Sequence, residues 1–163
     1  MIRSYVLSAA VLTAVSALPL AAQEHEHEGM HEQMMSVEYL GGGSNFSEAV
    51  RVGHTLYLSG KLGTVPGQGL VEGGIQPETR QTLENIKATL EDYGSSMDEV
   101  VKCTVFLADI AEWSAMNEVY TTFFPVNKPA RSAVAGSGLA LNARVEIECI
   151  ATVGLTQAMH DGM

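Results

Sequence analysis

The stretch VVKCTVFL at 100–107, followed by ADIAEWSAMNEVYTTF at 108–123, decides the fold. The first segment is rich in β-branched residues and predicts a strand. Asp109 and Glu112 then form a capping-box pattern, with Asp in place of the usual Ser or Thr, so a helix is expected to follow. Along that helix large apolar side chains recur at helical spacing: Trp113, Met116, Tyr120 and Phe123.

Outward from this unit, the chain predicts further strands and one more helix. Two short strands flank a tight turn at Gly53-His54, a Gly-rich loop covers 60–74, and a helix begins near Pro77 and ends at Gly94. Strands separated by helices and ending in a pair of strands predict an α+β domain, whose open sheet carries helices on one face. The uncovered face needs a partner, which an oligomer would supply. The expected strands are Ala49–Val52, Thr55–Ser59, Arg131–Ala135 and Ala143–Val153.

Composition narrows the class of protein. The 163 residues include 9 Lys and Arg against 19 Asp and Glu, a formal charge of −10. Such a surface repels phosphate backbones, so no nucleic-acid partner is expected. With 46% hydrophobic residues, the chain has enough apolar material for a folded core.

Residues 1–22, MIRSYVLSAAVLTAVSALPLAA, have the pattern of a secretory signal peptide. One Arg precedes an apolar stretch that ends in small residues, and cleavage is expected after Ala22. The alternative is an uncleaved membrane anchor. We therefore expect an exported, periplasmic protein with no stable membrane insertion after cleavage.

Residues 23–43 are rich in His, Met and Glu. Imidazole and thioether groups hold copper or zinc, so metal capture is one interpretation of this segment. It lacks the apolar periodicity that would hold its ligands in place, and a flexible tether ending at Gly41–Gly43 is the preferred interpretation. The potential metal ligands are His25, His27, His31, Met30, Met34 and Met35.

Cys103 and Cys149 each lie within an apolar strand, and buried inert thiols are the default expectation. A disulfide in an oxidising compartment is the alternative, and it depends on the separation of the two Cα atoms.

Charged residues in two apolar strands are candidates for chemistry. Arg131 begins a strand inside Pro-Ala-Arg-Ser, and Glu146 and Glu148 alternate with apolar residues in Val-Glu-Ile-Glu-Cys-Ile. Each lies either on a solvated face or in a cleft. An Arg on one strand and a Glu on its expected hairpin partner predict an anion-binding fork beside an acid–base group. The sequence has no Gly-rich phosphate loop, H-E-x-x-H or G-x-S-x-G motif, and His54 is interpreted as a polar turn residue.

Six segments, in order along the chain, share the pattern of one known family: AVRVGHTLYLSG at 49–60, TRQTLENIK at 79–87, VVKCTVFL at 100–107, MNEVY at 116–120, PARS at 129–132 and VEIE at 145–148. Together they resemble the RidA (YjgF-type) enamine/imine deaminases over about residues 46–153. With the N-terminal patterns above, four parts are expected: a signal peptide at 1–22, the tether at 23–43, a RidA-like domain at 44–155 and a tail at 156–163.

The resemblance implies a chorismate-mutase-like α+β fold, a mixed sheet with two helices packed on one face. It also implies a homotrimer whose sheets line the interior and whose three ligand clefts lie between subunits. Members of the deaminase type hydrolyse enamines and imines such as 2-aminoacrylate to a 2-keto acid and ammonia, without a metal or organic cofactor.

The same resemblance assigns roles to individual residues. Arg131 would hold the substrate carboxylate through two parallel hydrogen bonds, and Glu146 would direct water or transfer protons. The backbones of Gly60 and Ala133 and the side chain of Asn117 match positions that contact ligand or support the cleft.

This sequence departs from the family pattern at four positions near the expected cleft. Phe46, a substrate-binding candidate, replaces a frequent Tyr, and Lys61 replaces a frequent Gln. Ala133 replaces Cys or Thr, and Ala140 stands where Leu-Pro is usual. Two alternatives to the deaminase stay open: a non-catalytic binder of small carboxylates in the periplasm, and a metal-buffering or chaperone-like role of the tether.

Overall fold

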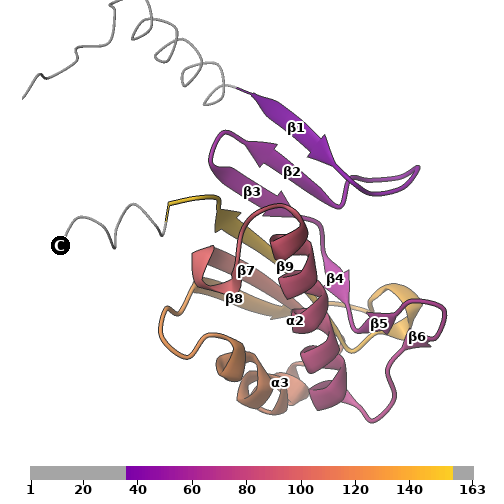
Figure 1. The fold of residues 1–163 in the computed structure, drawn as a ribbon. Helices are drawn as coiled ribbons and strands as arrows, with labels where there is room; N and C mark the ends of the chain where they lie inside the picture. The colour runs from indigo at the N-terminus through magenta and orange to yellow at the C-terminus, as the bar shows by residue number, and fades with distance from the viewer. Residues whose placement is uncertain (1–35, 156–163) are drawn as a thin grey trace, which may run out of the picture. The chain divides into compact units, whose positions relative to one another are not determined.

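Strands β7 (Val100–Leu107) and β9 (Val145–Thr152) are the two longest strands of the sheet in a computed structural model that describes residues 36–155 (Figure 1). The predicted signal peptide, most of the predicted tether and the tail at 156–163 lie outside the described residues. Within 36–155, no helix is long and apolar enough to cross a membrane.

The main sheet is mixed, with strand order β1-β2-β3-β9-β7-β8 and with β4 as a further neighbour of β9. Strands β7 and β8 run parallel, and the other pairs are antiparallel. Strands β5 and β6 form a separate small hairpin. The bounds are β1 Val37–Leu40, β2 Ala49–Val52, β3 Thr55–Leu58, β4 Lys61–Leu62, β5 Thr64–Val65, β6 Gly69–Leu70 and β8 Ala130–Ala135.

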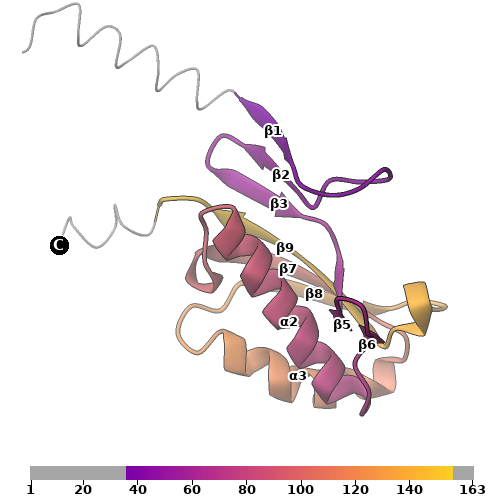
Figure 2. The ribbon, with the colours of Figure 1, turned by 45° about the vertical axis from the view of Figure 1, so that its right-hand side comes forward.

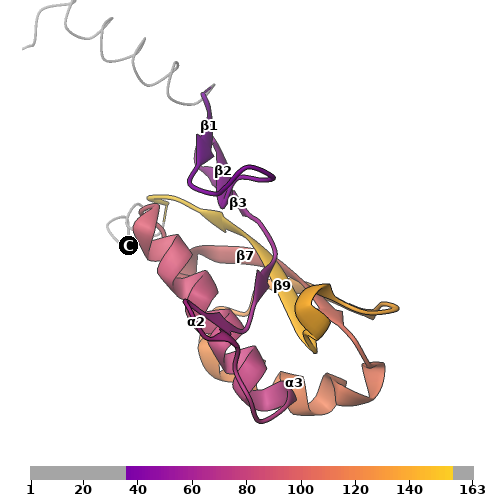
Figure 3. The ribbon, with the colours of Figure 1, turned by 90° about the vertical axis from the view of Figure 1, so that its right-hand side faces the viewer.

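Both long helices pack on one face of this sheet (Figures 2 and 3). They are α2 (Ile75–Asp92) and α3 (Trp113–Tyr120). The predicted α+β fold with two helices on one face is confirmed. Single 3-10 turns lie at Met97–Glu99, Ile110–Glu112, Thr121–Phe123 and Ala140–Asn142.

Of the two side-chain hydrogen bonds expected in the capping box before α3, only the one to Asp109 forms. The Asp109 carboxylate accepts a hydrogen bond from the Ala111 backbone N–H at 2.9 Å. Glu112 does not return to the cap, because its carboxylate pairs with the Arg144 guanidinium instead.

The expected pairing of the last two strands is wrong. Strand β8 pairs in parallel with β7, and β7 separates it from β9. Parallel neighbours need a crossover connection, and α3 supplies it between β7 and β8. The 136–144 segment then returns the chain to the other side of β7.

The folded domain begins earlier than residue 44. Strand β1 lies inside the segment predicted as a tether, and it pairs with β2 from Val37 opposite Val52 to Leu40 opposite Ala49. This pairing satisfies the outer backbone groups of β2, which a domain starting at 44 would leave unpaired.

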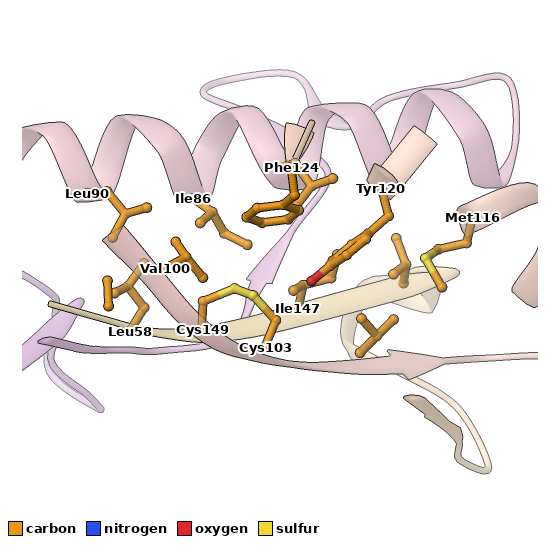
Figure 4. Close-up of a cluster of buried hydrophobic side chains, with 14 of the residues drawn as sticks. Leu58, Ile86, Leu90, Val100, Cys103, Met116, Tyr120, Phe124, Ile147 and Cys149 are labelled. Atoms are coloured by element: carbon orange, nitrogen blue, oxygen red, sulfur yellow. A yellow bond between two sulfur atoms is a disulfide. The ribbon is translucent and has the colours of Figure 1, made fainter. Parts of the chain in front are cut away.

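The core lies between the sheet and the helices (Figure 4). Cys103 and Cys149 face each other across β7 and β9 with Cα atoms 4.1 Å apart, and they form a disulfide. The expectation of two free thiols is therefore wrong, since the antiparallel register places the two cysteines directly opposite. Around the disulfide pack Leu58, Ile86, Leu90, Val100, Met116, Tyr120, Phe124 and Ile147 (Figure 4).

Among residues 36–155, no helix covers the other face of the sheet (Figure 3), and this face exposes large apolar side chains. Tyr57 lies near its middle, opposite Val50 on β2 and Ile150 on β9. Glu146 and Glu148 share this face, but large apolar side chains exposed together in this way mark an interaction surface. Its exposed members are Val37, Tyr39, Val52, Tyr57 and Val134.

Candidate active site

Arg131 lies on the helix-covered side of β8, level with Cys103 of β7. Its guanidinium carbon lies 4.6 Å from the centre of the Tyr120 ring and 5.6 Å from that of Trp113. One guanidinium nitrogen, Nη1, donates to Asn117 Oδ1 at 2.7 Å. Strand β8 and helix α3 thus hold the guanidinium in a fixed position.

A pocket of about 190 Å³ opens beside this guanidinium. Arg131 and Lys128 supply positive charge, and none of the lining residues is acidic. Burial raises the pKa of Tyr120 to about 12, although the Arg131 charge acts in the opposite direction, so the phenol stays neutral. The pocket therefore suits a small anion. The lining residues are Asn117, Tyr120, Thr121, Phe124, Lys128, Pro129 and Arg131.

Glu146 lies on the opposite side of the sheet. It is level with Phe106 on β7 and Leu62 on β4, while its neighbours Val145 and Ile147 face the buried core. The Glu146 carboxylate approaches Gly60 so closely that a Cβ atom on residue 60 would collide with it. A side chain at residue 60 would therefore force the Glu146 carboxylate to shift.

Gly60 also lines a groove of about 650 Å³, which Phe46, Lys61 and Leu141 help to form. We call this the Gly60 groove. It runs along β4 and is bounded by α2, the β5–β6 hairpin and the 140–142 turn.

An ion pair lies in the Gly60 groove. Lys61 Nζ lies 2.5 Å from Glu48 Oε1, and Tyr93 and Thr89 donate hydrogen bonds to the same carboxylate at 3.1 and 3.2 Å. The hydrogen bond from Lys61 lowers the pKa of Glu48, and partial burial opposes this effect. Burial, followed by the Glu48 charge and hydrogen bond, raises the pKa of Tyr93.

The predicted site residues fall into two groups within one chain. Arg131 and Asn117 are in contact, and Ala133 lies two residues further along the same side of β8. Phe46 and Gly60 share the groove, and Gly60 touches Glu146. Arg131 and Glu146 occupy opposite faces of the sheet, so one chain does not bring them together.

Sequence reasoning missed two kinds of residue. Trp113 and Tyr120 were expected only as core residues, yet both stack on Arg131, and their spacing from Asn117 on one helix was the available signal. Leu141 gave no signal, because its left-handed backbone (φ 58°) is not readable from the sequence. Within residues 36–155, no cluster of three His, Cys, Asp or Glu side chains could hold a metal.

The mixed sheet, its one-sided helices and the half-buried arginine beside a small pocket define an α+β domain with a candidate anion site. Residues 40–153 match the family model described as Endoribonuclease L-PSP. The chain is 44% identical over 110 residues to the 2-iminobutanoate/2-iminopropanoate deaminase of Rattus norvegicus, covering 67% of this chain and 80% of that protein. It is 40% identical over 109 residues to Reactive Intermediate Deaminase A, chloroplastic, of Arabidopsis thaliana, covering 66% of this chain. The chain spans 58% of the length of that plant protein.

Solved structures agree with these sequence matches. The crystal structure of RidA from a Psychrobacter species is 36% identical and superimposes with a TM-score of 0.65, covering 74% of this chain and 98% of that one. Yeast Mmf1 is 36% identical with a TM-score of 0.66, covering 69% and 90%. The chain belongs to the RidA family.

Proposed function

We propose that the protein is a hydrolytic deaminase of 2-imino acids and their enamine tautomers, and that it works as a homotrimer. The observation that carries the proposal is the separation of Arg131 from Glu146 by the thickness of the sheet. The Arg131 pocket of one subunit would meet the Gly60–Glu146 surface of the next, and each cleft would take one half from each subunit. The names of the rat and Arabidopsis relatives support the reaction.

Arg131 and Asn117 have a defined role in this mechanism. The guanidinium binds the substrate carboxylate through two parallel N–H donors, and Asn117 keeps its plane in one orientation. Fixing the carboxylate also fixes the adjacent imine carbon, and such positioning lowers a barrier by up to about 7–11 kcal/mol in ideal cases.

Glu146 handles the protons. Its carboxylate accepts a proton from a water molecule as the water oxygen bonds to the imine carbon, and the nitrogen takes a proton from solvent, which gives a carbinolamine. The proton held by Glu146 then passes to this nitrogen, and the carbon–nitrogen bond breaks to release ammonia. The hydroxyl proton leaves to solvent as the carbon–oxygen double bond forms. An enamine first takes up a proton from solvent at its β-carbon while its nitrogen releases one, which gives the imine. In total, imine and water give 2-keto acid and ammonia, with no change in oxidation state.

The family model's description names an endoribonuclease, but the charge of this chain favours a small substrate. At −10, the protein repels a phosphate backbone. The pocket beside Arg131, at about 190 Å³, has room for a carboxylate.

Mixed trimers test the proposal. Arg131→Ala and Glu146→Gln are each expected to abolish hydrolysis of freshly generated 2-aminoacrylate, measured as ammonia and keto-acid release. When equal amounts of the two variants are unfolded and refolded together, about a quarter of the clefts receive both wild-type side chains, so about a quarter of wild-type activity returns.

Two results would contradict this assignment. Unchanged turnover in Arg131→Ala would remove the role of the arginine, and a co-refolded mixture that stays inactive would remove the shared cleft. Binding of 2-ketobutyrate by the wild type without any hydrolysis would select the alternative, a non-catalytic carboxylate binder.

We also propose that the protein is exported to an oxidising compartment such as the periplasm. The apolar pattern of residues 1–22 and the Cys103–Cys149 disulfide support this, because disulfides persist mainly in such compartments. Mass spectrometry of the mature protein is expected to find Gln23 at the N-terminus, and an intact Met1 terminus would refute cleavage.

A further inference from the structure

We propose that the Gly60 groove receives the side chain of the substrate and selects imines whose side chain is bulky, apolar and uncharged, with Leu141 as a specificity-determining residue. This inference rests on the proposed deaminase function, because it assigns a substrate class to the same cleft.

The groove and the Glu146 carboxylate meet at Gly60. Gly60 lines the groove and also lies directly against the Glu146 carboxylate. Glu146 does not itself line the groove, so the side chain of a substrate whose imine carbon lies near Glu146 would enter the groove past Gly60. At about 650 Å³, the groove is much larger than the pocket next to Arg131, so it has room for more than a methyl group.

Two large apolar side chains line the groove and remain open to solvent. Phe46 is 66% exposed and Leu141 is 68% exposed. Apolar surface held in water at the border of a cavity gains free energy when an apolar ligand covers it. The 140–142 turn that carries Leu141 is the short yellow-orange helix in Figure 1, and Leu141 lines the groove together with Thr64 and Val65 of β5.

The backbone keeps Leu141 at this position. Leu141 and Asn142 both have left-handed φ angles, 58° and 57°. Asn adopts this conformation readily, but Leu rarely does. Because strained backbone concentrates in binding loops, the conformation supports a functional role for the turn.

Charge in the groove argues against an acidic substrate side chain. Lys61 is the one cation among the lining residues, and its ammonium group is paired with Glu48 at 2.5 Å. Asp92 adds a second carboxylate. The groove therefore carries net negative charge, and an imine with a second carboxylate would enter without a free positive partner.

The experiment compares three imines generated in the assay by an amino-acid oxidase. Their amino-acid precursors are alanine, leucine and glutamate. For the wild type, we expect kcat/KM for the leucine-derived imine to exceed that for the alanine-derived imine at least about tenfold, and the glutamate-derived imine to be the poorest of the three. Leu141→Ser should lower the leucine-to-alanine ratio at least about threefold. Val126→Ser, a matched change at a residue that is 78% exposed and outside the groove, should leave the ratio unchanged.

The outcomes separate this inference from the proposed function. Equal kcat/KM values for the three imines, or a preference for the glutamate-derived one, would overturn the inference and leave the deaminase intact. If no imine is hydrolysed, calorimetric binding of the keto acids derived from leucine and alanine replaces turnover, and equal Kd values would overturn the inference. A Leu141→Ser protein with a reduced assembly mass would also overturn it, since the groove would then hold a neighbouring subunit.

Discussion

Arg131 is the residue whose surroundings say most about the site. Its guanidinium lies over two aromatic rings and donates to one amide oxygen, and it forms no ion pair with a carboxylate of residues 36–155. A cation held by ring faces keeps its charge available for an external anion. This arrangement explains how the half-buried Arg131 stays ready to bind a carboxylate.

Trp113 should therefore act as a positioning residue for Arg131. We expect Trp113→Leu to weaken the binding of 2-ketobutyrate about two- to fivefold, because the ring face over the guanidinium is lost. Trp113→Phe keeps a ring at that position and should restore most of the affinity. Calorimetric titration checks both values, and a Leu variant that binds as tightly as the wild type would remove the role.

The Glu48–Lys61 ion pair is expected to make the free energy of unfolding depend on pH. Lys61 lowers the pKa of Glu48 in the folded protein. A group with a lowered folded pKa contributes stability above its unfolded pKa, and that contribution is lost as the pH falls through the folded value. Glu48→Gln should therefore unfold at lower urea concentration than the wild type at neutral pH, and the difference should shrink as the pH falls below about 4.5.

Urea unfolding at several pH values checks this expectation. Glu91→Gln is a suitable control. Glu91 is exposed and its carboxylate oxygen lies 4.0 Å from Lys87 Nζ, so this long surface ion pair should contribute little to stability at any pH. A Glu48→Gln difference that stays constant from neutral to acidic pH would contradict the assigned coupling.

At the scale of the elements, the Cys103–Cys149 disulfide joins the two central strands across 46 residues of sequence. By the chain-entropy relation, a loop of this length stabilises the folded state by about 4 kcal/mol. The Cys103→Ala/Cys149→Ala double variant should lose a free energy of unfolding of this order in urea titrations. Added reductant should shift the unfolding midpoint of the wild type and leave that of the double variant unchanged.

Elements with a periodic pattern of their own were predictable from the sequence. Helix α2, strand β7 and the β2–β3 hairpin lie where the apolar spacing and the turn residues place them. Strands β4, β5 and β6 have two residues each, too few for any period to show.

The order of the strands and the assembly of the site were harder to predict from the sequence. The place of β7 between β8 and β9 depends on a crossover, which local patterns do not encode. Arg131 and Glu146 were identified by their charge in apolar strands. Their placement on opposite faces follows from the strand register, and sequence reasoning had assumed a different pairing.

At the scale of the whole molecule, the uncovered sheet face predicts assembly. We expect light scattering to give three times the subunit mass. Tyr57→Asp places a charge in the middle of this face and should shift the protein to monomers. Val126→Asp, away from the sheet strands, should keep the wild-type mass, and a wild-type protein of monomer mass would contradict the trimer.

The placement of Arg131 and Glu146 on opposite sides of the sheet has a kinetic consequence. If each catalytic unit needs two chains, an isolated chain has none, and activity becomes a property of protein concentration. Specific activity would then decline when the enzyme is diluted below the dissociation constant of its assembly. It would return on reconcentration, with a lag set by how fast the chains find one another.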